Sequence, residues 1–318
     1  MSLAVVYSRI HNKVQEYKKS GLGGWLFDRI GSTKKIYPMK HDDIIRSSGI
    51  GNLCPRLETL CARDNIVRDD VIDPMLRWRF DVGTLTHHLY RDWYLGPLGM
   101  YRGRWKCLKC GWNTDGDELD KDGMPMKSMN PGPPHPAKRG FRLVRMPELC
   151  GRCGAGRDDE DGSKIIVFSE WDLVNHEYGI TGHTDGWRFD PDKKEILLQE
   201  IKSADQSSFA YTSINGPYYY TKKQISTYMW LTGFKRGEVV YLNKGAKSQS
   251  GKNDYDCLIK AHLVEFDFAW FKASVLDKIV DMRKCLKSGV LADRNCTTID
   301  SQSAKWCKYK DLCFSMKE

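Results

Sequence analysis

The chain has 318 residues, of which 41% are hydrophobic and 29% charged, a balance typical of globular proteins and unlike that of fibrous or disordered chains. Its 50 Lys and Arg residues outnumber its 41 Asp and Glu residues, and the formal net charge of +9 suits a polyanionic partner. The sequence has no run of 18 apolar residues, no apolar N-terminal signal segment and no Gly-x-x-x-x-Gly-Lys-Ser/Thr phosphate loop. We therefore expect a cytoplasmic protein that does not contact membranes and is not an ATP-driven motor.

The first third of the chain, residues 1–98, is predicted to be mainly helical. A turn at residues 47–51 precedes the first cysteine. Farther on, Gly83 opens a predicted helix whose apolar stripe would be formed by Leu85, Leu89 and Trp93. His87 and His88 lie off this stripe, so either histidine can face a functional site.

Two Cys-x-x-Cys-Gly knuckles follow, at residues 107–111 and 150–154. The glycine of each knuckle lets the backbone turn its amides toward sulfur, and two such knuckles supply the four thiolates of a tetrahedral zinc site. A redox-active Cys-x-x-Cys is the alternative for either knuckle alone. Between them, residues 115–136 are rich in Asp, Gly, Pro and Met without apolar periodicity, which predicts a loop. We expect residues 99–160 to form a zinc-binding insertion held by Cys107, Cys110, Cys150 and Cys153.

Basic and aromatic residues gather around the knuckles. Such a mixture can contact phosphates and stack on unpaired bases, but it is equally typical of a solvated surface whose aromatic side chains pack against the core. The residues concerned are Tyr101, Arg102, Arg104, Trp105, Lys106, Lys109, Lys138, Arg139, Arg142 and Arg145.

After a strand at residues 165–168, two strands are predicted between residues 182 and 202, joined by a hairpin through residues 190–192. Alternate side chains of a strand share a face, so Glu200 and Lys202 project together, and the hairpin can bring Asp185 beside them. Two carboxylates at that separation can hold Mg²⁺ or Mn²⁺, while a lysine beside the ion can orient or deprotonate an attacking water. The pattern therefore indicates phosphodiester hydrolysis. A solvated surface salt bridge is the alternative.

A helix is predicted after Gly216 and Pro217, with Gln224 and Tyr228 four residues apart on one face. Residues at its start are the better candidates for DNA contact, namely Tyr218, Tyr219, Tyr220, Lys222 and Lys223. The remaining predicted elements are strands at 238–242 and 258–266, the latter at a sheet edge, and an amphipathic helix at 269–286.

The order Gly-x-x-x-His, Gly-x-x-Asp, Glu-x-Lys and Gln-x-x-x-Tyr resembles the RecB-type branch of the PD-(D/E)xK nuclease superfamily. The resemblance implies that His87, Asp185 and Glu200 bind the catalytic metal through their side chains and that Ile201 offers its backbone carbonyl. It also implies that Lys202 is catalytic, and that Gln224 and Tyr228 support the site and the DNA. The spacing from Gly83 favours His87 over His88 as the ligand.

The cysteines extend this resemblance, because clusters of thiols in a reducing compartment imply metals. Cys54 lies early in the chain and three more lie late, at Cys296, Cys307 and Cys313, which looks like the iron–sulfur subgroup that includes CRISPR adaptation nucleases and AddB-type recombination nucleases. By this resemblance the four thiolates bind a 4Fe–4S cluster that joins the two ends of the chain. Ten residues rather than two separate Cys296 from Cys307, so Cys285 and Cys61 are alternatives to Cys296.

Together these patterns predict a restriction-endonuclease-like α/β fold, a mixed sheet flanked by helices, with residues 161–318 forming the nuclease core and the cluster-binding region. The expected activity is that of a Mg²⁺- or Mn²⁺-dependent deoxyribonuclease, an exonuclease or flap nuclease acting on single-stranded or frayed DNA ends and leaving a 5′-phosphate and a 3′-hydroxyl. The alternatives are a DNA-end-binding module that no longer cuts and a redox- or zinc-sensing regulator. By family analogy, the partners would be recombination or CRISPR adaptation proteins in a bacterial, archaeal or phage-infected cell.

Overall fold

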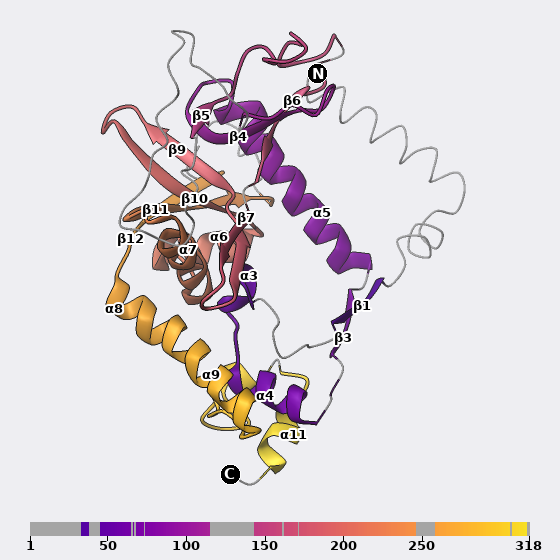
Figure 1. Ribbon diagram of the computed structural model, residues 1–318, viewed down its shortest axis with the longest axis vertical. Coiled ribbons are helices and arrows are strands. Elements are labelled where there is room, and N and C mark those ends of the chain that lie inside the picture. Colours follow the sequence, from indigo (N-terminus) through magenta and orange to yellow (C-terminus); the bar gives the residue numbers. More distant parts are fainter. Residues whose placement is uncertain are drawn as a thin grey trace, which may run out of the picture.

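The computed structural model describes residues 33–37, 45–64, 66, 68–72, 74–114, 143–160, 162–170, 172–245, 258–305 and 307–316 (Figure 1). The loop predicted at residues 115–136 lies outside the described residues, as do Lys138, Arg139, Arg142 and Cys257.

Three sheets contain all the strands that the structure describes. The largest has the order β12-β11-β10-β9-β4-β5, with β6 also paired to β4, and its strands are β4 (Tyr101–Cys107), β5 (Val144–Arg145), β6 (Ile166–Ser169), β9 (Gly186–Asp190), β10 (Glu195–Ala204), β11 (Arg236–Asn243) and β12 (Ile259–Glu265). Only β10 and β11 are parallel in this sheet. A second sheet joins β2 (Ile45–Arg46), β8 (Ile180–His183) and β7 (Asp172–Asn175), and β1 (Thr33–Tyr37) pairs with β3 (Arg68–Ile72).

The helices are α3 (Ser47–Ile50), α4 (Pro55–Arg63), α5 (Pro74–His88) with its π-helical continuation η1 (Leu89–Leu95), α6 (Gln206–Asn215), α7 (Tyr219–Thr232), α8 (Phe268–Phe271), the π-helical η3 (Lys272–Leu276), α9 (Asp277–Ser288), α10 (Gln302–Lys305) and α11 (Lys310–Ser315). Residues of α6 and α7 pack on one face of the large sheet and residues of η1 on the other, whereas α4 and α11 lie together at the end of the molecule away from β4 (Figure 1). None of the helices in the described part of the chain has the length and apolar character needed to cross a membrane.

Strand β10 separates the two layers of the hydrophobic core. Leu198 packs with residues of α6 and α7 on one face, whereas Ile201 packs with Tyr90, Tyr101 and other residues of η1, β4 and β6 on the opposite face. This division follows from the two-residue period of a strand. Because Glu200 and Lys202 have the parity of Leu198, their side chains lie on the face covered by α7.

Helices α6 and α7 form the crossover between the parallel strands β10 and β11. Asp205 caps α6 by accepting a 2.8 Å hydrogen bond from the backbone N–H of Ser208. Gly233, with a φ of 78°, ends α7 in the left-handed conformation and donates its N–H to the carbonyl of Met229. The crossover thereby brings α7 back over the face of β10 that carries Glu200 and Lys202.

The predicted hairpin is confirmed, since β9 and β10 pair antiparallel from Asp190 opposite Glu195 to Gly186 opposite Gln199. The helix carrying Gln224 and the strands at 165–168, 238–242 and 258–266 are also confirmed. The predicted helix at 269–286 exists as the continuous run of α8, η3 and α9.

The prediction that residues 1–98 are mainly helical holds for their described part, where α3, α4, α5 and η1 outweigh the short strands β1, β2 and β3. The prediction for the helix that carries His87 is wrong. The helix begins at Pro74 rather than Gly83, and the predicted stripe fails because Leu85 is 47% exposed. After His88 the helix widens to π geometry, so a 3.6-residue period no longer predicts the buried face, which is formed by Tyr90, Arg91 and Asp92.

Candidate active site and cysteine centres

Asp185 lies between β8 and β9, and the pairing of Gly186 with Gln199 places it beside Glu200. Its Oδ2 accepts a 2.7 Å hydrogen bond from the backbone N–H of Ile201. Its backbone carbonyl accepts hydrogen bonds from the hydroxyl of Tyr101 at 2.5 Å and from Nη1 of Arg91 at 3.3 Å. Three elements therefore fix the position of this carboxylate.

The glycines on either side of Asp185 allow close packing. A Cβ atom on Gly182 would lie 2.4 Å from Oγ of Ser47 and 2.7 Å from Cε1 of Tyr228. Gly186 has a φ of 140°, which disfavours other residues, and a Cβ there would lie 2.4 Å from the hydroxyl of Tyr101. The close approach of Ser47 and Tyr228 to Gly182, and of Tyr101 to Gly186, therefore explains both glycines of the Gly-x-x-Asp-Gly sequence.

We expect Gly182→Ala to lower the free energy of unfolding by about 1–3 kcal/mol, because the added methyl group overpacks the contact between β8, α3 and α7. Urea unfolding of the purified variant measures this effect. Gly49→Ala in α3 is the matched control, since a Cβ on Gly49 has no neighbour within 4 Å, and we expect it to keep the stability of the wild type or raise it by up to about 1 kcal/mol, because alanine favours helix more than glycine does. Equal stability of Gly182→Ala and the wild type would contradict the packing described.

Lys202 links the acidic residues to α7. Its Nζ lies 2.5 Å from Oε1 of Glu200 and donates a 2.9 Å hydrogen bond to Oε1 of Gln224. Gln224 in turn donates through Nε2 to the hydroxyl of Tyr228 at 3.2 Å. Glu200 is nearly inaccessible, with 3% of its side chain exposed, whereas 29% of the Lys202 side chain is exposed. The lysine therefore extends from a buried carboxylate toward solvent.

The two neighbouring histidines face different partners. His87 Nδ1 lies 3.4 Å from Oδ1 of Asp185, whereas His88 Nδ1 lies 3.0 Å from Oδ2 of the buried Asp92. Asp92 also accepts the backbone N–H of Phe168 at 3.1 Å, so the pair of His88 and Asp92 supports β6. The structure thus brings His87, and not His88, to Asp185.

Gly83 explains how α5 comes close enough to the sheet for His87 to reach the site. A Cβ atom on Gly83 would lie 3.1 Å from Oγ of Ser203 in β10. An alanine at this position would be in tight contact with the Ser203 hydroxyl, and a larger side chain would have less room still. The side chain of Ile201 is fully buried on the opposite face of β10, so only its backbone faces the acidic residues.

The pKa values in this group of side chains are strongly perturbed. Burial raises the pKa of Glu200 to about 7 despite the nearby Lys202, and the charge of Asp185 adds to the rise. Burial opposes ionisation of Asp185 too, but His87, Arg91 and Lys202 hold its pKa well below the usual range. The pKa of Lys202 is raised by the two carboxylates despite burial. Two buried carboxylates repelling each other beside an imidazole form a set of donors that a hard divalent cation would stabilise.

Sequence reasoning missed Arg91 and Tyr101 as supports of the site. Tyr101 is fully buried on β4, and Arg91 is 3% exposed on η1, where it also lies 3.3 Å from Glu170. Neither residue belongs to a recognisable motif. Their contacts with Asp185 join residues 94 and 84 positions apart, and the only sequence signal for Tyr101 was the alternation of residues 101, 103, 105 and 107 with basic residues.

The knuckle cysteines lie together and form one group whose sulfur atoms are all within 4.8 Å of one another. Cys107 Sγ is 3.8 Å from Cys153 Sγ, and Cys110 Sγ is 3.5 Å from Cys150 Sγ. Zn–S bonds of about 2.3 Å in a tetrahedron require S···S separations of about 3.8 Å. The spacing therefore fits a single tetrahedral ion, and it is too long for disulfides.

The two knuckles have the same backbone conformation. Gly111 and Gly154 have φ values of 75° and 68° and donate their N–H groups to the carbonyls of Cys107 and Cys150, each at 2.9 Å. The buried Trp112 packs against Cys107 and Cys150. The small core of this region is therefore built around the thiols.

The prediction that Trp105 stacks on unpaired bases is wrong. Trp105 is fully buried, its Nε1 donates to the carbonyl of Val144 at 3.0 Å, and its ring packs edge-on against Phe168. The alternation of β4 explains this, because Tyr101, Gly103, Trp105 and Cys107 all face the core. The aromatic residues around the knuckles are thus packing residues.

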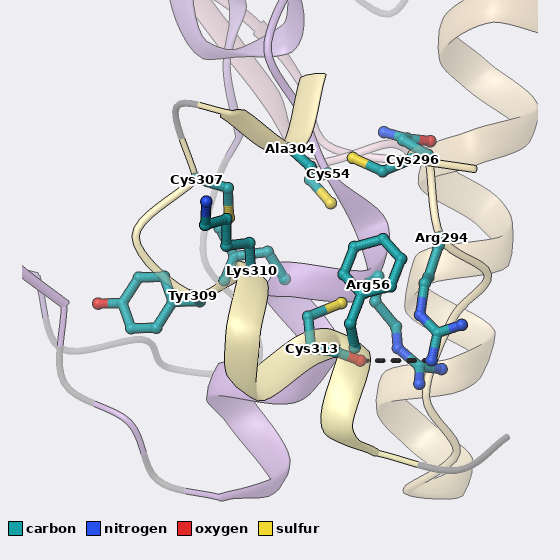
Figure 2. Close-up of a pocket in the computed structure, with 12 residues that line it drawn as sticks. Cys54, Arg56, Arg294, Cys296, Ala304, Cys307, Tyr309, Lys310 and Cys313 are labelled. Carbon is teal, nitrogen blue, oxygen red and sulfur yellow. Dashed lines mark hydrogen bonds between the residues drawn. The ribbon is translucent and has the colours of Figure 1, made fainter. Parts of the chain in front are cut away.

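The four remaining candidate cysteines line one pocket near the C-terminus. Figure 2 shows Cys54, Cys296, Cys307 and Cys313 surrounding the same space, which amounts to about 350 Å³ including its opening to solvent. Cys61 and Cys285 do not line it. The structure therefore places Cys296, and neither alternative, beside the other three.

Hydrogen bonds tie the segments that carry these cysteines. Asn295 donates to the carbonyl of Leu53 at 3.0 Å, and Arg294 donates to the carbonyl of Cys313 at 3.3 Å. Burial raises the pKa of the Cys54 thiol, and the other three thiolates add to this rise. Arg56, Arg294 and Lys310 also line the pocket and supply positive charge around the sulfur atoms.

No protein-family model matches the sequence, and no curated protein matches it. Among solved structures, similarity is found to an alkaline exonuclease from Laribacter hongkongensis, with 21% identity and a TM-score of 0.29 over 37% of this chain and 58% of that one. The same exonuclease in complex with dAMP gives 22% identity and a TM-score of 0.28 over 37% and 58% of the two chains. A phage-related exonuclease from Haemophilus somnus 129PT gives 14% identity and a TM-score of 0.23 over 38% and 60%. The chain thus spans less than two thirds of each, and the function has to be argued from the geometry of its own site.

Proposed function

We propose that this protein is a metal-dependent DNA nuclease. The observation that carries the proposal is the convergence of Asp185, Glu200 and Lys202 at one point of the sheet, with His87 3.4 Å from Asp185. A surface salt bridge would not need the burial of Glu200, which is 2% exposed, or the several hydrogen bonds that hold Asp185. Perturbed carboxylates beside a lysine are typical of a functional site.

Each residue has a role that its contacts support. Asp185, Glu200 and His87 would hold Mg²⁺ or Mn²⁺, together with the carbonyl of Ile201. The bound ion would polarise the phosphate and lower the pKa of an attacking water. Lys202 would orient that water and balance the charge of the phosphate, and Gln224 holds Nζ of Lys202 in place at 2.9 Å. Tyr228 fixes Gln224 through its hydroxyl.

The two cysteine sets would hold different metal groups. The sulfur spacing of 3.5 and 3.8 Å in the knuckles supports a zinc ion. The sulfur atoms of Cys54, Cys296, Cys307 and Cys313 do not form such a close group, although all four residues line one pocket. Thiolates at the corners of a cluster stand farther apart than the ligands of one ion, which supports a 4Fe–4S cluster at this pocket.

The position of the second cysteine set favours substrates with free ends. Figure 1 shows α4, α9 and α11 together at the end of the molecule away from β4, and α4 packs against both helices. A cluster there would close the chain into a ring through Cys54 and the C-terminal cysteines. A ring admits a strand end more readily than an unbroken double helix, so exonucleolytic or flap cutting of linear single strands is the proposed reaction.

A cleavage assay tests the proposal. With Mg²⁺ or Mn²⁺ we expect rapid degradation of linear single-stranded DNA, little cleavage of covalently closed single-stranded circles, and none of either in EDTA. The rate should fall with added salt as phosphate contacts weaken. Binding of DNA without cleavage under any of these conditions would instead support the DNA-end-binding alternative. Equal rates on circles and linear strands would contradict threading and indicate an open-cleft endonuclease.

A further inference from the structure

Three tyrosines of the crossover helices, one from α6 and two from the start of α7, stack into a column. Tyr211 of α6 lies parallel to Tyr218, with ring centroids 5.1 Å apart and planes inclined by 7°, and Tyr218 lies parallel to Tyr220 of α7 at 5.2 Å and 9°. The two outer rings are accessible, with 51% of Tyr211 and 42% of Tyr220 exposed. We call Tyr211, Tyr218 and Tyr220 the tyrosine column.

The column adjoins the candidate active site through two connections. Tyr218 donates its backbone N–H to the hydroxyl of Tyr241 at 3.4 Å, and Tyr241 is the β11 partner of Lys202. Tyr220 also stands one helical turn before Gln224, the residue that accepts the hydrogen bond from Lys202. Lys202 on β10 is therefore followed by Gln224 and then Tyr220 along α7.

Two lysines of α7, Lys222 and Lys223, each lie over an aromatic ring. Nζ of Lys222 lies 4.9 Å from the ring centre of Trp270, and Nζ of Lys223 lies 4.6 Å from that of Tyr219. Burial and the charge of Lys278 lower the pKa of Lys223 to about 8, and no carboxylate in the described part of the chain raises it. Because Lys223 covers its ring, Tyr219 is a poor stacking surface, in contrast to the outer faces of the column.

We propose that the tyrosine column is a stacking platform for the bases of single-stranded DNA entering the site, with the exposed Lys222 contacting its phosphates. This inference rests on the proposed nuclease function. Parallel rings with exposed end faces offer an unpaired base the same stacking that a neighbouring base would, whereas the bases of a duplex are already stacked. The platform therefore selects single strands without reading their sequence.

Equilibrium binding of a short fluorescent oligothymidylate in EDTA tests this inference without any cleavage. We expect Tyr211→Leu and Tyr220→Leu each to weaken binding about 5- to 150-fold, the range expected for loss of one stacked base. Tyr211→Phe keeps the ring and should bind like the wild type. Tyr94→Leu on η1 is the matched control, because Tyr94 is 52% exposed but is not part of the column, and it should also bind like the wild type.

Abasic positions in the oligonucleotide sharpen the test. One abasic position should weaken binding to the wild type by a similar factor. It should have no further effect on the variant whose missing tyrosine stacked on that base, but should weaken binding to the other variant again. Wild-type affinity of both leucine variants would overturn the platform, as would an equal loss of affinity for blunt duplex DNA. Cleavage assays on the same proteins separate the two proposals. If the wild type cleaves DNA with a divalent metal but the leucine variants bind as the wild type does, the nuclease proposal holds and the platform is wrong. If the leucine variants bind more weakly but the wild type never cleaves, the platform holds and the nuclease proposal is wrong.

Discussion

Replacing Glu200 by glutamine is expected to lower the rate of DNA cleavage at least ~100-fold, the loss seen when one preorganised electrostatic group is removed from an active site. Glutamine keeps an oxygen that Lys202 can reach but removes the charge that would bind the metal. Asp185→Ala and Lys202→Ala should lose activity on the same scale. Rates on linear single-stranded DNA at saturating Mg²⁺ measure the effect.

Stability must be measured alongside, because Glu200 and Lys202 form a buried pair at 2.5 Å and removing one partner leaves the other uncompensated. Circular dichroism and urea unfolding show whether each variant is folded. Lys193→Ala is the matched control, since Lys193 is exposed in the turn of the same β9–β10 hairpin, and its activity should be unchanged. Full activity of Glu200→Gln would remove Glu200 from the chemistry.

Anaerobically purified protein is expected to be brown and to contain about four irons and one zinc per chain, because the two cysteine sets offer four thiolates each. Cys307→Ser should lose the iron and the colour but keep the zinc. Cys150→Ser should lose the zinc but keep the colour. Elemental analysis and visible absorption measure both outcomes on the same samples.

Cys285→Ser is the control for these variants, because Cys285 lies outside the lining of the C-terminal pocket and outside the knuckle group. It should retain both metals. Two zinc ions and no iron in the anaerobic wild type would show that the pocket of Cys54, Cys296, Cys307 and Cys313 binds a single ion, contrary to the proposed cluster.

The hairpin and the parity of β10 could be predicted because both depend on neighbours in sequence. The turn at residues 191–194 fixes the register, and once Gly186 pairs with Gln199, Asp185 must lie beside Glu200. The position of Gln224 followed from helical spacing in the same way. These local rules bring most of the candidate catalytic residues together without knowledge of the fold.

The remainder depends on contacts between distant segments. The spacing from Gly83 favours His87 as the ligand, but the role of His88 could not be predicted, because its partner Asp92 lies on the π-helical η1 that follows. Tryptophan is a residue type that can stack on bases, yet the alternation of β4 places the Trp105 side chain in the core. Cys296 could not be separated from Cys285 until the hydrogen bond from Asn295 to Leu53 placed it beside Cys54.

Strand β4 makes the knuckle region inseparable from the chemistry. One end of this seven-residue strand carries Tyr101, which holds the carbonyl of Asp185, and the other end carries Cys107. Loosening the knuckle would free the Cys107 end of β4, while the Tyr101 end of the same strand supports the candidate metal ligand Asp185. Engineering a shorter protein by removing residues 99–160 would therefore delete the sheet strands β4 and β5 and a support of Asp185, and a minimal version has to keep β4 and close the chain beyond it.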